Sequence, residues 1–155
     1  MRVKDIMTPE PYCCAIFEPV QNAARMMKDW DVGSLPVVAD QHSWRLKGIV
    51  TDRDLCTVLA EGTDPATIPV EKVMTRDPAT CKPEDDVDSC AKIMREHQVR
   101  RLPVVDDQGH CIGIVAQADL ALKGKLQQVS ATVAEISKPP RQRIVWLENM
   151  WHVLE

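Results

Sequence analysis

Val3-Lys4-Asp5-Ile6-Met7-Thr8 recurs 67 residues later as Val70-Glu71-Lys72-Val73-Met74-Thr75, and this recurrence is the strongest indication of the fold. At the same offset Leu35-Pro36-Val37-Val38 falls on Leu102-Pro103-Val104-Val105. Between residues 3–38 and 70–105, 13 of 36 aligned positions are identical, whereas ordinary residue frequencies would give about two. The chain is therefore an internal tandem duplication.

Both copies contain the same order of expected elements. Alternating apolar positions predict strands, and apolar residues at i, i+3, i+4 and i+7 predict helices with one buried face. The expected elements of the two copies are, in chain order, strands at Tyr12–Ile16 and Ala79–Lys82, helices at Pro19–Trp30 and Pro83–His97, strands at Leu35–Ala39 and Leu102–Asp106, strands at Leu46–Thr51 and Cys111–Ala116, and helices at Asp52–Glu61 and Gln117–Lys123. This order predicts a mixed α+β (α/β) chain. A unit this small cannot bury both faces of its sheet alone, so the two should pack together across a pseudo-twofold.

The repeat also sets the expected domain organisation. Gly62 and Gly124 follow the last helix of each copy, as helix ends often require, and they place unit 1 at residues 1–62 and unit 2 at residues 68–124. Residues 125–155 have no counterpart in the repeat and are expected to be a helical extension. Its apolar residues at helical spacing are Leu126, Val129, Val133 and Ile136, then Ile144, Leu147, Trp151 and Leu154 beyond the break at Pro139-Pro140. This face packs either on its own module or on a partner.

Composition narrows the function classes. The net charge is −4 with a pI near 5.6, which argues against a nucleic-acid binder that tracks phosphates. No apolar run reaches the roughly 18 residues of a membrane span, and Met1–Asp5 lacks the apolar core of a signal peptide, so a cytoplasmic location is expected. The six cysteines form no C-x-x-C pair and are expected to be free thiols. The four histidines show no metal-ligand spacing, so no metal site is expected.

The most informative segment is Gly48-Ile49-Val50-Thr51-Asp52-Arg53-Asp54-Leu55, at a predicted strand-to-helix junction. A helix N-terminus attracts phosphate, and a carboxylate there can accept hydrogen bonds from ribose hydroxyls. Thr51 and Asp54 also fit a helix-capping box, so capping and ligand binding both stay open. The second copy keeps Asp119 but has Ala116 in place of the threonine. A reciprocal cap is not expected to explain Asp119 well, and its retention favours a ligand role slightly.

Arg100 and Arg101 stand directly before Leu102, where the first copy has Gly33 and Ser34. Two adjacent guanidinium groups can hold a polyphosphate through paired hydrogen bonds, although they also fit a solvated surface pair. The chain has no G-x-x-x-x-G-K-[ST] loop and no G-x-G-x-x-G, so a nucleotide would not be held as in ATPases or dehydrogenases. No segment resembles a nucleophile elbow. The sequence therefore predicts a protein that is not an enzyme.

Each copy resembles a CBS domain, named after cystathionine β-synthase, and the pair resembles a stand-alone Bateman module. The resemblance covers about Val3 to Gly124. It rests on the ordered recurrence of several short motifs, which are Asp5-Ile6-Met7-Thr8 with Pro11, Gly33-Ser34-Leu35-Pro36-Val37-Val38 and Gly48 to Leu55 in the first copy, and Val73-Met74-Thr75 with Pro78, Val99 to Asp106 and Gly113-Ile114-Val115 in the second.

This resemblance implies two β-α-β-β-α units packed sheet to sheet, with two clefts that bind AMP, ADP, ATP or S-adenosylmethionine. It assigns the ribose to Asp54 and less completely to Asp119, and a hydroxyl contact to Thr51. It brings Arg100 and Arg101 from unit 2 to the Thr51–Asp54 site, with Arg53 adding charge. The segments around Cys13 and Thr80 (Tyr12–Cys14 and Ala79–Cys81) would line the base. One competent phosphate site and one weaker or empty site are therefore expected.

The sequence thus predicts a non-catalytic regulatory module with an adenosine nucleotide as its ligand, no obligatory cofactor, a homodimeric state and a regulated protein partner. The alternative is a structural dimerisation or assembly module whose ligand clefts are vestigial. Ligand titration separates the two predictions.

Overall fold

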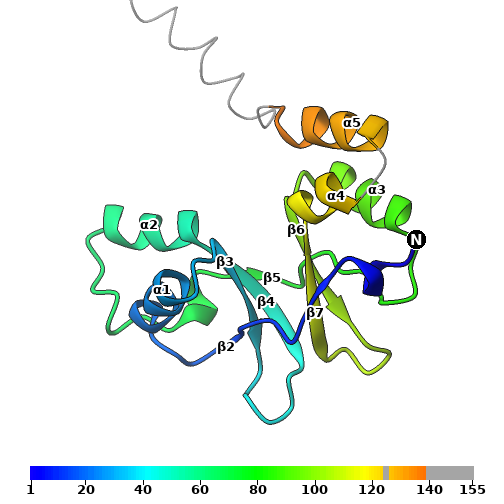
Figure 1. The fold of residues 1–155 in the computed structure, drawn as a ribbon. Helices are drawn as coiled ribbons and strands as arrows, with labels where there is room; N and C mark the ends of the chain where they lie inside the picture. The colour runs from blue at the N-terminus through cyan, green and yellow to red at the C-terminus, as the bar shows by residue number, and fades with distance from the viewer. Residues whose placement is uncertain (124–125, 139–155) are drawn as a thin grey trace, which may run out of the picture.

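The computed structural model describes residues 1–123 and 126–138. Two α/β units lie side by side, with α1 and α2 outside the first sheet and α3, α4 and α5 outside the second (Figure 1). The sheets lie between these two sets of helices. The expected α+β fold with two repeated units is confirmed.

The first unit follows the predicted order closely. It contains β2 (Cys14–Ala15), α1 (Val20–Asp29), β3 (Ser34–Val38), β4 (Leu46–Thr51) and α2 (Asp52–Ala60). The buried residues of α1 recur at helical spacing and face the sheet, and they are Val20, Ala23 and Met27. The apolar spacing that predicted this helix is therefore also the spacing of its buried residues.

The second unit repeats this order with α3 (Val87–His97), β6 (Arg101–Val105), β7 (Cys111–Ala116) and α4 (Gln117–Lys123). The helix begins at Val87 instead of the predicted Pro83. The carbonyls of Pro83 and Asp85 instead accept the N–H groups of Lys4 and Val3 at 3.0 and 2.9 Å. The strand predicted at Ala79–Lys82 is reduced to a single parallel bridge between Cys81 and Val104.

Two short strands were not predicted from the sequence. They belong to the segments that lead into each unit, and each of them pairs with a strand of the other unit. β1 (Thr8–Pro9) pairs antiparallel with β7 of the second unit. β5 (Thr75–Arg76) pairs antiparallel with β4 of the first unit. The sheets therefore have the strand orders β1-β7-β6 and β2-β3-β4-β5.

The cores are exchanged in the same way. The 3-10 turn η1 (Val3–Asp5) leads into Ile6, and both Val3 and Ile6 are buried in the core of the second unit. Its repeat, η2 (Val70–Lys72), buries Val70 in the core of the first unit. Each unit is thus completed by residues that precede the other unit in sequence.

The exchanged segments explain a glycine in each copy. A Cβ on Gly48 would lie 2.5 Å from Met74 Sδ, and a Cβ on Gly113 would lie 2.6 Å from Met7 Sδ. Both glycines are buried in central strands. The repeated methionines of the leading segments therefore pack where a side chain on the repeated glycines would stand.

The extension begins with α5 (Leu126–Ile136), which packs over the helices of the second unit (Figure 1). Ile136 belongs to the core of that unit. The Arg95 guanidinium on α3 donates a hydrogen bond to Thr132 Oγ1 at 2.9 Å. The described part of the extension thus packs on its own module, while Gly124 and the predicted apolar face at residues 144–154 lie outside the described residues.

Candidate functional site

The strand-to-helix junction of the first unit forms a capping box. The backbone N–H and the hydroxyl of Thr51 both donate to Asp54 Oδ2 at 2.8 Å, and the Asp54 N–H donates to Thr51 Oγ1 at 3.4 Å. The capping interpretation of these two residues is therefore confirmed. It leaves room for a ligand, because an ionised carboxylate offers about four acceptor positions and Asp54 is only half-buried.

The second unit keeps part of this arrangement. The backbone N–H of Ala116 donates to Asp119 Oδ2 at 2.7 Å. As expected, no reciprocal cap forms here, because Ala116 has no hydroxyl to complete it, but this one-sided hydrogen bond by itself gives Asp119 a capping role. Retention of the aspartate in both copies is thus accounted for by helix capping, and it no longer favours ligand binding by itself.

Ser34, at the start of β3, is a further residue of this site, which the sequence motifs did not indicate as a ligand contact. It lies opposite Thr51 in the β3–β4 ladder. Leu35 and Val37 point into the core of the first unit, so Ser34 faces the other side of the sheet, toward the second unit. Its side chain is 5% exposed, and its Oγ is the buried side-chain polar atom without a hydrogen-bond partner in residues 1–123 and 126–138. Such an unpaired group costs about 1–3 kcal/mol.

Arg101 begins β6 and occupies the position of the second unit that matches Ser34. Its guanidinium crosses to the first unit. Two of its nitrogens lie 3.4 and 3.7 Å from the point that a Cβ on Gly33 would occupy, and Asp52 Oδ2 lies 3.3 Å from the same point. The Asp52 N–H in turn donates to the Gly33 carbonyl at 3.1 Å. A cation from one unit therefore lies at the start of β3 and α2 of the other.

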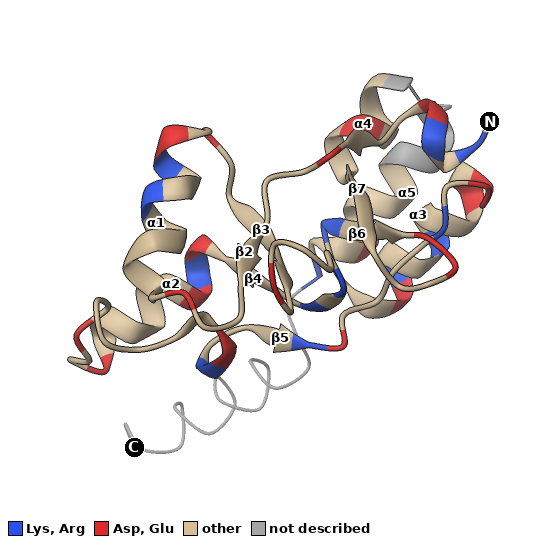
Figure 2. Cartoon of the chain, turned by 90° about the horizontal axis from the view of Figure 1, so that it is seen from below, with Lys and Arg blue, Asp and Glu red and all other residues tan. Residues whose placement is uncertain are grey.

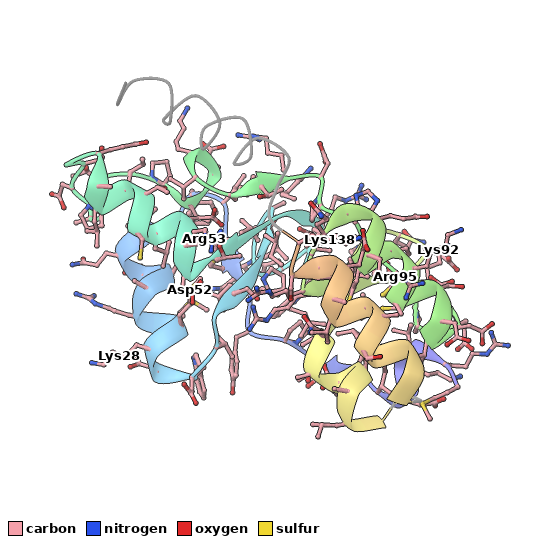
Figure 3. All side chains as sticks on the ribbon, turned by 90° about the horizontal axis from the view of Figure 1, so that it is seen from above. Lys28, Asp52, Arg53, Lys92, Arg95 and Lys138 are labelled. Atoms are coloured by element: carbon pink, nitrogen blue, oxygen red, sulfur yellow. The ribbon has the colours of Figure 1, made fainter. Side chains whose placement is uncertain are left out.

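The other predicted site residues lie on several different segments. Arg53 is exposed at the start of α2 (Figure 3), and Arg100 is exposed while its carbonyl accepts the Gln117 N–H at 2.8 Å. Cys13 is buried beside Val38, at the end of β3 opposite to Ser34. Thr80 is half-buried in the segment before α3. The structure thus groups Thr51, Asp54 and Arg101 around the start of β3, and it leaves Arg100, Cys13 and Thr80 outside that group.

The distribution of charge and of possible metal ligands limits which kinds of ligand the residues around the start of β3 can bind. Figure 2 shows acidic and basic segments interspersed over both units. The described residues contain no cluster of three side chains able to hold a metal ion. None of the helices described is long and apolar enough to cross a membrane. The arrangement offers one inter-unit cation, Arg101, and one unpaired buried hydroxyl, that of Ser34, which together suit an anionic group. The Thr51 hydroxyl already donates its proton to Asp54.

Comparison with known proteins agrees with the repeat. The family model of the CBS domain matches residues 3–61 and 70–123. The chain is 40% identical over 121 residues to the CBS domain-containing protein YhcV of Bacillus subtilis, covering 77% of this chain and 83% of YhcV.

Two solved structures resemble the fold and carry ligands. One is the CBS domain pair of protein MJ0100 in complex with 5′-methylthioadenosine and S-adenosyl-L-methionine, with 30% identity, a TM-score of 0.70, and coverage of 79% of this chain and 98% of that chain. The other is CBSX2 in complex with AMP, with 27% identity, a TM-score of 0.65, and coverage of 88% and 98%.

Proposed function

The chain belongs to the CBS domain family, and we propose that it is a non-catalytic regulatory module that binds an adenosine-type nucleotide between its two units. The candidate ligands are AMP, ADP, ATP and S-adenosylmethionine, each acting as a regulatory ligand and not as an obligatory cofactor. Ligand would act by binding one packing of the two units more tightly than another.

The observation that carries this proposal is the position of the Arg101 guanidinium beside Gly33, the residue before Ser34. The guanidinium of Arg101 crosses from the second unit to Gly33, next to Ser34, whose buried hydroxyl has no partner among the described residues. A phosphate oxygen can accept hydrogen bonds from a hydroxyl and from a guanidinium at the same time. Binding would therefore satisfy a polar group that the free protein leaves unpaired.

The remaining roles follow the family resemblance residue by residue. Asp54 would accept the ribose hydroxyls with its free carboxylate positions, and Thr51 would add a hydroxyl contact. Arg53 and Arg100 would add charge at the rim. The segments that contain Cys13 and Thr80 would line the base. Asp119 would serve a second, weaker site, because Ala116 supplies no hydroxyl and Arg101 is directed to the first unit.

Ligands in related structures support this choice of chemistry. The pair in MJ0100 is described with 5′-methylthioadenosine and S-adenosyl-L-methionine, and CBSX2 with AMP. These ligands share adenosine but differ in charge at the 5′ position. The position of Arg101 favours the phosphate-bearing ligands for this chain.

Isothermal titration of the full chain with AMP, ADP, ATP, S-adenosylmethionine and 5′-methylthioadenosine tests the proposal. We expect Arg101→Ala to weaken phosphate-bearing ligands about 10- to 100-fold, since a hydrogen bond to a charged group contributes roughly 1.5–3 kcal/mol. Binding of 5′-methylthioadenosine, which has no phosphate, should be nearly unchanged. Arg100→Ala is the matched control: because this exposed side chain would add charge only at the rim, its loss should weaken binding by no more than about twofold. Absence of heat with every ligand at millimolar concentration would refute the function.

Three further parts of the proposal are independent of that titration. We propose a homodimer, which light scattering of the full chain tests directly, and a regulated protein partner whose identity the ligand does not determine. The cytoplasmic location expected from the sequence stays a prediction.

A further inference from the structure

Two buried cysteines meet at the end of β3 that lies opposite to Ser34. The β1–β7 ladder continues past Pro9, where the Glu10 N–H donates to the Ile112 carbonyl at 3.1 Å. The residues that follow Glu10 therefore run alongside Cys111, the first residue of β7. Cys13 and Cys111 are 6% and 4% exposed, and both pack in one small apolar cluster with Val38.

The two thiols also interact with each other. The Cys13 thiol donates to the Pro11 carbonyl at 3.3 Å, and its interaction with the neighbouring Cys111 sulfur, with burial as the next cause, raises the pKa of Cys13. The same interaction lowers the pKa of Cys111, against the effect of burial, while the Cys111 thiol donates to the Gly113 carbonyl at 3.6 Å. Two sulfurs packed in one cluster, one of them with a lowered pKa, are the arrangement from which a disulfide can form once an oxidant reaches them.

We propose that Cys13 and Cys111 form a reversible disulfide, with a peroxide as the oxidant, that joins the segment before β2 to β7 and so ties the two units together. The inference goes beyond nucleotide binding and does not depend on it. It identifies a redox modification site at the junction between the units.

The chemistry balances with one equivalent of hydrogen peroxide. The Cys111 thiolate attacks one peroxide oxygen, the O–O bond breaks, and the leaving hydroxide takes a proton to become water. The Cys13 thiol then loses its proton, and its sulfur attacks the sulfenic acid of Cys111. The S–O bond breaks, and hydroxide leaves with that proton as a second water. Two thiols are oxidised to one disulfide while the peroxide is reduced to two waters.

The cysteine pair is present at one of two positions related by the repeat, so the fold itself does not require it. The positions that match Cys13 and Cys111 in the other copies are Thr80 and Leu46, so the equivalent crossing point has no sulfur. A second thiol pair, Cys81 and Cys90, interacts in the same way, so that the pKa of Cys81 is raised and that of Cys90 is lowered. It lies inside the core of the second unit, at 2% and 0% exposure, and joins no two units. That pair is therefore the matched control.

Mass spectrometry of the full chain after treatment with hydrogen peroxide tests the proposal. We expect the intact monomer to lose about 2 Da, peptide mapping to find Cys13 linked to Cys111, and a phosphine reductant to reverse both changes. The midpoint of thermal unfolding should rise by several degrees on oxidation, because the bond closes a loop of nearly 100 residues. Cys13→Ala should abolish the mass loss and the shift, whereas Cys81→Ala should retain both.

Three results would overturn the proposal. The first is an unmodified wild-type protein, and the second is oxidation to sulfinic acid without a cross-link. The third is a disulfide that uses Cys14, Cys56, Cys81 or Cys90 in place of the pair proposed. Because mapping is done on the wild-type chain, none of these readings depends on whether a variant folds.

Discussion

The first unit has Gly33 and Ser34 where the second has Arg100 and Arg101, although the two units match closely in their cores. The matched positions, such as Gly48 and Gly113, lie where an exchanged methionine packs. The mismatched positions lie at the starts of β3 and β6, where the units meet. Packing in the cores therefore keeps the two copies alike, whereas the residues that line the surface between the units differ and make the two halves of that surface chemically unequal.

Substitution of the glycines at the matched core positions should change stability most. Gly48→Ala should destabilise the protein by about 2–3 kcal/mol, because the new Cβ would lie 2.7 Å from the Thr75 carbonyl as well as 2.5 Å from Met74 Sδ, and overpacking costs about this much. Gly113→Ala should cost only about 1 kcal/mol. The nearest backbone atom there is 3.3 Å away, and the flexible Met7 side chain can move.

Urea denaturation of both variants measures this difference. If Gly113→Ala proves as damaging as Gly48→Ala, the backbone contact with β5 is not what makes the first glycine necessary. The two copies would then be equally constrained in their cores.

The next effect concerns the helix caps, in which the copies differ by one hydroxyl. Thr51→Ala should cost about 1 kcal/mol of stability, and Ala116→Thr should add up to about the same amount, since Asp119 already accepts its half of the box. For a chain of this size each change corresponds to a shift of roughly 2–4 °C in the unfolding midpoint. A destabilising Ala116→Thr would show that the second junction cannot accommodate the first unit's cap.

The smallest stability effect is expected at Ser34, and its sign is informative. Ser34→Ala removes an unpaired buried hydroxyl, so stability should rise by up to about 1 kcal/mol. Affinity for phosphate-bearing nucleotides should nevertheless fall several-fold in the same titration that tests Arg101. A gain in stability with unchanged affinity would mean that the hydroxyl serves no ligand.

The repeat made most of this fold predictable. It defined β3, β4, β6 and β7 to within about one residue, because each is a β-branched run bounded by turn residues. It did not reveal β1 or β5, which contain two residues each. Such short strands have no periodicity of their own, and their partners lie far away in sequence.

The candidate site was predictable only in part. The mismatch between Ser34 and Arg101 was visible in the aligned copies, and so were Thr51 and Asp54. The direction of the Arg101 side chain toward Gly33 depends on how the units pack, and the lack of a partner for Ser34 depends on every atom around it. Neither property is encoded in a local pattern of residues.

The exchange of leading segments has a consequence for synthesis on the ribosome. Thr8 pairs with Ile114, so roughly 100 further residues must be made before β1 can find its partner, which takes about 5–20 s at ordinary translation rates. The first unit has most of its strands by then, but its core also waits for Val70 and Met74. The nascent chain must therefore keep Val3 and Ile6 from unwanted contacts throughout that interval, and folding should complete both units together at the end.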